Sequence, residues 1–490
     1  MSKRILILRA LMAVCFIALA TRLWRLGWQD AYEMTLKTCR QRLAVETGTG
    51  WSRGDFYDRE GLPLTNRLEG GAHGRPSSDR YGERPLAVHL LGYVNPGDGR
   101  GASGLEEACD DLLAQGPGRA VATVVDGHQR PIPGLGVRVV RPPSDAPGNV
   151  RLTIHRGLQA KVDEIADRTL PKGAIVVMSP WTGEILALAS RPAFDPNHPA
   201  AGLGAAGAPF INRALAAYQP GSVFKLVVLA AALEEDPEAF WQIYRDPGRL
   251  ELGMLRFSCP GQGHGEVTLA DALAFSCNTT FIRLGLALGA KKLVRMAERL
   301  GFGLPVLQDL SGEHPGELPP AYGQTPGDVA NASIGQGGVL ATPVQIARLV
   351  SAIANGGFLV TGKVMLGMED SGGRFQPFGE SHAPVRVLSQ ETARRMRDMM
   401  AGVVRYGTGR AAAIPAGAGG KTGTAQTGRS DERGRRLNHA WFAGFAPLTR
   451  PACVAVVFAE EGGSGAQVAA PIFNQVMAAA LACMEGRTGT

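Results

Sequence analysis

The sequence predicts an α/β fold of the α+β type, with helices flanking a central antiparallel sheet of five strands. Two apolar runs, 174–178 and 184–189, flank a Pro/Gly turn and form a predicted hairpin, and their near-continuous apolarity indicates that both faces of the sheet are covered. Three further strand-like runs close the chain, at 421–426, 440–445 and 453–459. Helical patches with loops separate the two groups, and the short turns within each group make the sheet antiparallel.

The composition is that of a globular protein with a large core. The 490 residues suffice for two or three domains, and 45% hydrophobic with 19% charged residues does not fit a disordered or multi-spanning chain. The formal net charge of +7 is modest for this length. No block of basic residues carries interleaved aromatics, so no nucleic-acid partner is expected.

An apolar segment near the N-terminus predicts a membrane anchor. The span 5–23, broken only by Arg9 and Arg22, approaches the ~20 residues that a spanning helix needs, and Trp24 and Trp28 suit the membrane interface. The small-x-small pattern at 18–20 also fits the cleavage site of a signal peptide. We favour an uncleaved, single-pass anchor in the cell membrane, with the bulk of the chain extracytoplasmic.

A composition shift divides the rest of the chain. The region that follows the anchor is polar and Gly-rich, with a short helical pattern that opens at Gly104. The Pro-rich stretch 142–148 predicts a domain boundary, and the pattern of 152–167 predicts an amphipathic helix or a strand that leads into a helix. The predicted parts are a short cytoplasmic tail (1–4), a transmembrane anchor (5–23), a small pedestal domain (24–150) and a main domain (151–490).

The stretch 218–225, YQPGSVFK, and the apolar run 226–233 organise the main domain. A Pro-Gly turn precedes a predicted helix that is apolar on every side and therefore buried. Ser222 and Lys225, three residues apart, lie on one helical face. Because burial disfavours the charged amine, Lys225 must either be paired or lose its proton, and a neutral amine there would be a base beside a serine nucleophile. The competing interpretation is an N-cap serine followed by a lysine that reaches the surface.

A second polar group, Ser276-Cys277-Asn278, interrupts an apolar context within a helical pattern that spans 270–288. Two polar side chains separated by one residue are costly there unless they meet partners or a ligand. The alternative is a helix cap.

A third group, Lys421-Thr422-Gly423-Thr424, opens an apolar strand. Position 415 is proline, so the spacing of a phosphate-binding loop is absent. A glycine inside a strand often marks a place where another backbone comes close, as a peptide substrate along a sheet edge would.

Serine with lysine three residues later, then Ser-x-Asn, then Lys-Thr-Gly, in this order, resembles the signature of penicillin-binding proteins and serine β-lactamases. Further stretches look like class B penicillin-binding proteins, the monofunctional peptidoglycan D,D-transpeptidases. These stretches are Arg53-Gly54 with Asp58-Arg59 and Gly61, Gly104-Leu105-Glu106, Gly183-Glu184, Phe194-Asp195-Pro196-Asn197, Asn212-Arg213, Ser333-Ile334-Gly335-Gln336-Gly337 with Thr342-Pro343, and His439-Ala440-Trp441-Phe442 with Gly444.

The resemblance implies a role for each motif residue. Ser222 is the acylated nucleophile and Lys225 its base, Ser276 relays the proton to the leaving amine, and Asn278 holds the substrate amide. Lys421 supplies positive potential. The hydroxyls of Thr422 and Thr424, on either side of Gly423, bind the terminal carboxylate, and the backbone N–H groups of Ser222 and Thr424 form the oxyanion hole.

The resemblance also implies a fold, ligands and partners. It predicts a penicillin-binding, serine β-lactamase-like transpeptidase domain after a dimerisation-type pedestal. The predicted donors are peptidoglycan stem peptides ending in D-Ala-D-Ala, with an amine acceptor. β-Lactam antibiotics would acylate the same serine, a SEDS-family glycan polymerase would be the partner, and neither a cofactor nor a metal is expected.

Three alternatives stay open. A serine β-lactamase needs a carboxylate and a water poised to hydrolyse the acyl-enzyme, and no Glu-bearing loop takes that role; the anchor and pedestal argue against it as well. A carboxypeptidase shares the motifs but not the pedestal stretches. A non-catalytic scaffold of a wall-synthesis complex is disfavoured because no catalytic position is substituted.

The seven cysteines show no CxxC spacing, which excludes the familiar zinc and redox patterns. Cys259 and Cys277 flank a Gly-rich segment just before Ser-x-Asn. In an extracytoplasmic domain these two thiols are candidates for a disulfide that braces the loop beside the active site.

Overall fold

The computed structural model describes most of the chain. The described residues are 3–28, 43–46, 53–65, 80–113, 120–124, 137–140, 148–259, 261, 263–369, 374–379 and 383–485.

A five-stranded antiparallel sheet forms the centre of the main domain, which confirms the predicted fold. The strands lie in the order β16-β17-β18-β6-β7, so the two early strands join the three late ones through the β18–β6 pair. The strand bounds are β6 Gly173–Met178, β7 Ile185–Arg191, β16 Gly419–Ser430, β17 Arg436–Ala446 and β18 Cys453–Ala459. The strand β16 runs past its predicted end at 426, because its polar end still pairs with β17.

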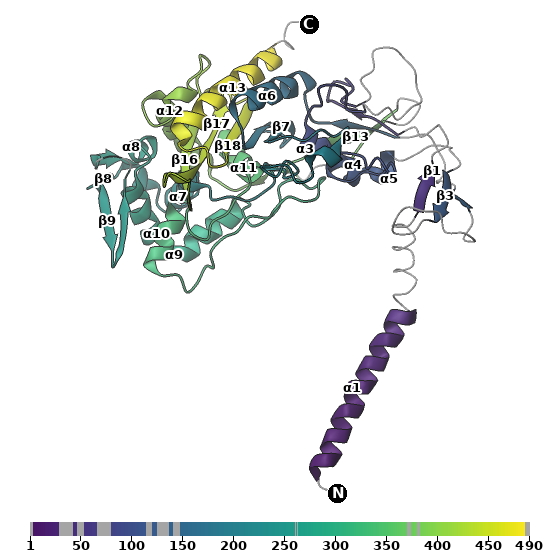
Figure 1. Cartoon of the computed structure of the whole chain (residues 1–490). Helices are drawn as coiled ribbons and strands as arrows, with labels where there is room; N and C mark the ends of the chain where they lie inside the picture. The colour runs from purple at the N-terminus through teal and green to yellow at the C-terminus, as the bar shows by residue number, and fades with distance from the viewer. Residues whose placement is uncertain are drawn as a thin grey trace.

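Both faces of the sheet are covered, as the apolar strands predict. Alternate residues of β6 point to opposite sides: Val176 lies in one apolar cluster and Ile175 in the other. Figure 1 shows α6 (Arg156–Thr169) and α13 (Ala470–Glu485) along one face and α11 (Pro343–Ala354) on the other. On the same side of the sheet as α11, below β16 in this view, lies α7 (Lys225–Glu235).

The helical insert between the two strand groups carries the rest of the main domain. Its helices are α8 Leu269–Ala274, α9 Asn278–Arg299, α10 Pro326–Ser333 and α12 Gln390–Arg405. Its strands form two antiparallel pairs: β8 Ile243–Asp246 with β11 Gly265–Thr268, and between them in the chain the hairpin of β9 Arg249–Leu252 and β10 Leu255–Ser258. The predicted continuous helix over 270–288 is wrong. The chain leaves the helix after Ala274 and restarts at Asn278, because Ser276 adopts a left-handed conformation with φ 59°.

A second sheet joins the N-terminal region to the main domain. Its order is β14-β13-β5-β2, built from β2 Phe56–Tyr57, β5 Asn149–Leu152, β13 Met365–Glu369 and β14 Phe375–Pro377. The predicted boundary at 150 therefore falls inside β5, and the division into domains stays a prediction. The remaining short elements are α3 Val88–Leu91, α4 Gly104–Ala108, α5 Asp110–Leu113, the β1-β3-β4 sheet (Leu43–Glu46, Ala120–Val124, Val137–Val140) and the β12–β15 pair (Phe358–Leu359, Val385–Arg386).

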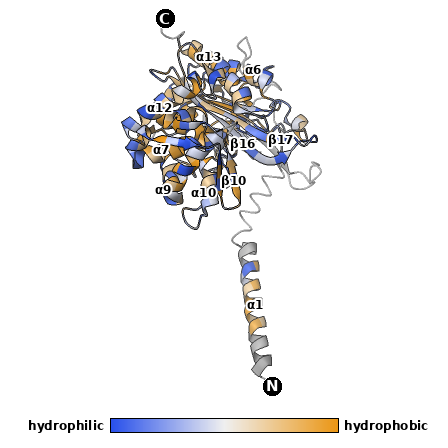
Figure 2. Cartoon of the chain, turned by 90° about the vertical axis from the view of Figure 1, so that its left-hand side faces the viewer, coloured by the Kyte–Doolittle hydropathy of each residue, from blue (hydrophilic) through white to orange (hydrophobic). Residues whose placement is uncertain are grey.

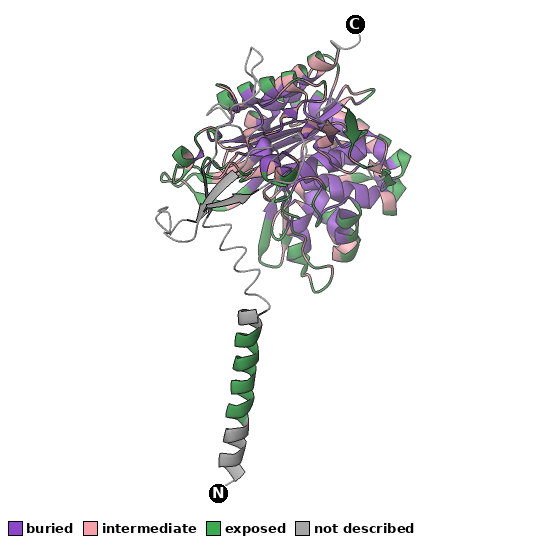
Figure 3. Ribbon diagram, turned by 90° about the vertical axis from the view of Figure 1, so that its right-hand side faces the viewer, coloured by how far each residue is buried: buried purple, intermediate pink, exposed green. Residues whose placement is uncertain are grey.

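The first helix, α1 (Lys3–Trp28), covers the predicted anchor. Figures 2 and 3 show that its described part is largely hydrophobic and exposed. Among the residues whose side chains the structure describes, Gly465–Met484 is the one helical stretch long and apolar enough to cross a membrane, and Leu11–Trp24 within α1 is a shorter apolar stretch. The stretch Gly465–Met484 packs Phe473 and Val476 into the apolar cluster on the sheet, so it is a core helix of the main domain.

Candidate active site

A tight turn presents Ser222. Residues Gly221–Phe224 form one 3-10 turn, and α7 continues from Lys225. Gly221 has φ +53°, and a Cβ there would lie 2.8 Å from the carbonyl oxygen of Thr424. Its N–H donates to the carbonyl of Gly335 at 3.0 Å. Only glycine fits this position, and the nucleophile turn is thereby held against β16.

Lys225 lies beneath the turn, fully buried. Its Nζ donates to the Ser276 carbonyl at 2.7 Å, to Ser276 Oγ at 3.2 Å and to Asn278 Oδ1 at 2.7 Å. Burial lowers the pKa of Lys225 to about 7, although the negative charge available on Cys277, Cys259 and Asp246 opposes the shift. A substantial fraction of the amine is therefore neutral near pH 7 and can accept a proton.

Lys421, on β16, is a second buried lysine that contacts the Ser276 hydroxyl. Its Nζ donates to Ser276 Oγ at 3.0 Å and to the Thr422 carbonyl at 2.9 Å. Burial first, and the charge of Lys225 second, lower the pKa of Lys421 well below its usual range. Ser276 Oγ thus bridges two buried amines, which is the arrangement that a proton relay requires.

The start of β16 forms one wall of the site. Thr422 and Thr424 are two residues apart and share one side of the strand, whereas Gly423 faces the nucleophile turn, where a Cβ would lie 2.9 Å from the Pro220 carbonyl oxygen. Thr424 Oγ1 accepts a hydrogen bond from the N–H of Gly465 at 3.3 Å.

These groups meet in a pocket of about 620 Å³. The predicted residues that line it are Ser222, Ser276, Asn278, Thr422 and Thr424. Lys225 and Lys421 are fully buried and do not line the pocket. Asn278 Nδ2 also donates to the Ser258 carbonyl at 2.6 Å, which fixes the side chain that is predicted to hold the substrate amide.

The sequence analysis missed Thr408. Its hydroxyl lies 2.7 Å from that of Thr422, and both line the pocket. The only signal is its place between Gly407 and Gly409 after α12, a pattern that many surface turns share.

The transpeptidase domain family of the penicillin binding proteins matches residues 173–478. The chain belongs to this family. Its class B resemblance is supported by a relative named peptidoglycan D,D-transpeptidase FtsI from Escherichia coli, 30% identical over 442 residues, which cover 84% of this chain and 69% of that protein.

Two further relatives of this penicillin-binding protein are longer. Stage V sporulation protein D of Bacillus subtilis is 35% identical over 79% of this chain and 61% of its own length. Peptidoglycan D,D-transpeptidase MrdA of Acinetobacter baumannii is 30% identical over 80% of this chain and 65% of its own length. The chain thus spans somewhat less than two thirds of these relatives.

Solved structures agree with the fold. The D,D-transpeptidase domain of a peptidoglycan glycosyltransferase from Eggerthella lenta has a TM-score of 0.72 at 30% identity, covering 89% of this chain and 99% of that one. Penicillin binding protein 3 from Mycobacterium tuberculosis, complexed with ampicillin, has a TM-score of 0.71 at 25% identity, covering 90% and 96%.

The candidate disulfide between Cys259 and Cys277 is not formed in this structure, although the two residues are neighbours. The two sulfurs lie 3.6 Å apart, and both residues are free thiols in this structure.

Proposed function

We propose that this protein is a peptidoglycan D,D-transpeptidase, a serine-type acyltransferase that works through an acyl-enzyme on Ser222. The observation that carries the proposal is the Ser276 hydroxyl held between two buried lysines, at the edge of a pocket that Ser222 also lines. Acyl transfer needs a nucleophile, a base and a route for the proton in one pocket, and these groups supply all three.

In the first half of the reaction, Ser222 Oγ attacks the carbonyl carbon between the two terminal D-Ala residues of a stem peptide. Lys225, neutral in its buried site, takes the hydroxyl proton. The backbone N–H groups of Ser222 and Thr424 stabilise the oxyanion, and the threonines of β16 bind the terminal carboxylate. Ser276 then passes a proton to the departing D-Ala amine.

In the second half, the amine of a neighbouring stem peptide attacks the ester on Ser222. The same groups act in reverse: the amine loses a proton through Ser276 and Lys225, and Ser222 leaves as the free hydroxyl. The product is a cross-link between two peptides. A β-lactam resembles the D-Ala-D-Ala end, so it acylates Ser222, and its opened ring stays attached and blocks the acceptor.

We place the protein at the cell membrane, anchored by α1 with the catalytic domain outside. The proposed partner is a SEDS-family glycan polymerase. A solved structure that describes the coordination of polymerization and crosslinking by a peptidoglycan synthase complex is 27% identical to this chain with a TM-score of 0.69, which supports a partner of this kind.

The test is covalent labelling of the full chain, in detergent, by a fluorescent penicillin. Wild-type protein is expected to take up one label that persists. Ser222→Ala is expected to abolish labelling, and Lys225→Ala to slow it by ~10²–10⁴-fold, the usual cost of losing a general base. Ser430→Ala, on the exposed far end of β16, is the matched control and should label normally.

Each alternative predicts a different result. If the protein is a non-catalytic scaffold, the folded wild-type protein fails to label. Labelling of the Ser222→Ala variant would instead contradict the assignment of Ser222 as the nucleophile. A β-lactamase would release the label and turn over the lactam. A carboxypeptidase would release D-Ala from a stem peptide in water without joining an added amine acceptor.

A further inference from the structure

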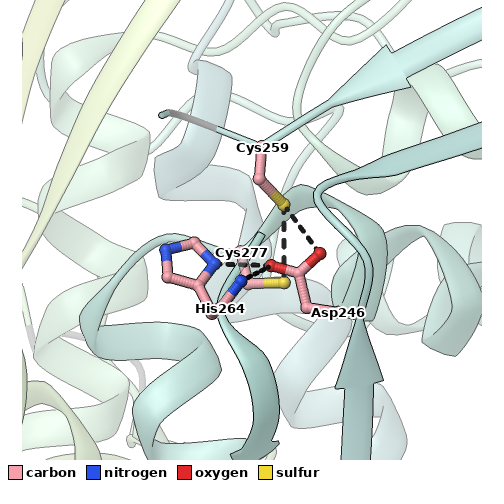
Figure 4. Close-up of side chains that lie close together, drawn as sticks. All are labelled: Asp246, Cys259, His264 and Cys277. Atoms are coloured by element: carbon pink, nitrogen blue, oxygen red, sulfur yellow. Dashed lines mark hydrogen bonds and ion pairs between the residues drawn. The ribbon is translucent and has the colours of Figure 1, made fainter. Parts of the chain in front are cut away.

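Four side chains with metal-binding groups gather beside the active site. Figure 4 shows Asp246 at the end of β8, Cys259 just after β10, His264 just before β11, and Cys277 at the N-cap of α9. One ligand atom from each lies within 4.8 Å of the other three. The function proposed above uses none of these groups directly.

The cluster is close to the geometry of a metal site. Cys259 Sγ lies 3.6 Å from Cys277 Sγ and 3.4 Å from Asp246 Oδ1. His264 Nδ1 lies 2.5 Å from Asp246 Oδ2. In a tetrahedral zinc site with bonds of 2.0–2.3 Å, the ligand atoms are roughly 3.3–3.8 Å apart, so small adjustments suffice. Asp246 and both cysteines are buried, and His264 is partly exposed.

We propose that Asp246, Cys259, His264 and Cys277 bind a thiophilic divalent cation such as Zn²⁺, and that the bound ion and a Cys259–Cys277 disulfide are mutually exclusive states of the site. Two thiolates and an imidazole favour zinc over magnesium or calcium, which take oxygen ligands. Four protein ligands also leave no open position, as in structural zinc sites.

The ion would brace the Ser-x-Asn turn. Cys277 is the residue between Ser276 and Asn278, and the Asn278 N–H donates to Cys259 Sγ at 3.2 Å. Thr279 Oγ1 donates to Asp246 Oδ1 at 2.7 Å. A metal that joins Cys277 to the 246–264 segment therefore holds the turn in which Ser276 keeps its left-handed conformation. The four ligands are positioning residues for the relay serine.

The two thiols can serve only one of the two cross-links. A disulfide requires the sulfurs to approach from 3.6 Å to about 2.05 Å, and it removes both thiolate ligands. It forms by thiol–disulfide exchange: the two thiols lose two electrons and two protons to a disulfide oxidant, which becomes two thiols. In a compartment that favours disulfides, the bound ion keeps Cys259 and Cys277 reduced.

The first test measures metal content and does not depend on transpeptidase activity. The full chain, purified in detergent and equilibrated with Zn²⁺ before desalting, is expected to retain one zinc per chain. Co²⁺ in its place should give the absorption bands of thiolate-bound tetrahedral cobalt. Cys259→Ser and His264→Ala should each lower zinc affinity by at least 10-fold, whereas Cys483→Ser, a free cysteine on α13, should not.

The second test follows the thiols. Metal-free wild-type protein treated with oxidised dithiothreitol should lose two titratable thiols and yield a Cys259–Cys277 peptide in mass spectrometry, and Zn²⁺ should prevent both. Cys259→Asp keeps an anionic ligand but removes the pair. This variant should bind Zn²⁺, form no such disulfide and label with penicillin at the same rate with and without oxidant. Wild-type protein that has been oxidised without metal should label at least 10-fold more slowly than the same protein before oxidation.

Three results would overturn the proposal. One is wild-type protein that retains no more zinc than the Cys259→Ser variant, which would mark the ion as adventitious. The second is a cobalt complex without thiolate bands, a readout that needs no variant to fold. The third is a disulfide that forms equally fast with and without Zn²⁺.

Discussion

The Ser276 hydroxyl lies between two buried lysines. It accepts hydrogen bonds from Lys225 and Lys421, both fully buried, so its own proton is free to point into the pocket. If both lysines were protonated, two ammonium groups in contact with one hydroxyl would repel each other, and their burial would raise the free-energy cost of both charges. At least one amine is therefore expected to be neutral, as the proposed role of Lys225 as the base requires.

The rate of acylation should depend on the protonation of Lys225. Its pKa is lowered from an ordinary 10.5 to about 7 by burial, so the amine is protonated and inactive below pH 7 and neutral above it. The second-order rate constant for a fluorescent penicillin should thus rise with pH and level off above about 7. On the acid side it should fall about tenfold for each pH unit.

As a control for this pH profile, the denaturation midpoint is measured at each pH. A midpoint that does not change shows that the rate constant follows the titration of the base and not unfolding of the protein. A rate constant that stays flat between pH 5.5 and 8.5 while the protein remains folded would contradict Lys225 as the base.

For single residues, the sequence predicts which side chains belong to the site better than it predicts which atoms they contact. The motif residues were predicted, and five of them line the pocket. The acceptors of Lys225 were not predictable, because they come from a turn 51 residues away. The conformation of Ser276 was not predictable either, since apolar periodicity continues through the break between α8 and α9 and gives no sign of a positive φ.

Among the elements, we expect the contact between the nucleophile turn, Gly221–Phe224, and β16 to hold the site together. Both segments approach backbone to backbone at Gly221 and Gly423. The strands β6, β7, β16, β17 and β18 were predictable from their apolar runs. The sheet β14-β13-β5-β2 was not, because its strands have two to five residues and come from segments far apart in the sequence.

Gly221→Ala should uncouple the turn from β16. The added Cβ would lie 2.8 Å from the Thr424 carbonyl oxygen, so the turn or the strand has to move, and with it the N–H groups of Ser222 and Thr424 that are proposed to form the oxyanion hole. Penicillin labelling should slow by roughly 10²-fold or more, as expected for a misplaced oxyanion donor. Stopped-flow labelling of the folded variant measures the change.

Gly253→Ala is the matched control. Gly253 has a similar φ of +61°, but a Cβ there meets nothing within 4 Å. The Gly253→Ala variant therefore has the backbone strain of a positive φ but no steric clash between the added Cβ and a neighbouring segment. If both variants label equally well, the close approach at Gly221 is not what holds the site.

At the scale of the whole molecule, Glu106 ties the N-terminal region together. Its carboxylate, fully buried, accepts from Arg53 Nε and Arg80 Nε at 2.7 Å each and from the Tyr81 hydroxyl at 3.1 Å. Glu106→Gln keeps the volume but removes the buried negative charge that Arg53 and Arg80 share, and leaves each guanidinium with one other carboxylate, Asp110 for Arg53 and Asp55 for Arg80. The free energy of unfolding of this region should fall by about 3–5 kcal/mol.

Denaturant unfolding, followed together with penicillin labelling, checks this expectation. Glu391→Gln is the control, since Glu391 also pairs with two arginines, Arg394 and Arg395, but on an exposed helix surface. Its midpoint should not change measurably. Equal effects from the two substitutions would show that burial of the Glu106 cluster is not what stabilises the region.

The last prediction concerns the attachment of the whole chain to a membrane. Along the described part of α1 the apolar side chains are exposed, with Phe16 74% and Ile17 66% accessible, and water is a poor solvent for such a surface. A bilayer removes that cost, and a helix of 26 residues is long enough to span one. We therefore expect the native protein to keep this helix, to sediment with membranes and to expose 24–490 to protease added outside.

Mass spectrometry of the native N-terminus tests whether the helix is kept, because a mature chain that begins at Thr21 would mean a cleaved signal peptide. A chain that starts after Trp28 should leave the membrane fraction and still label with penicillin.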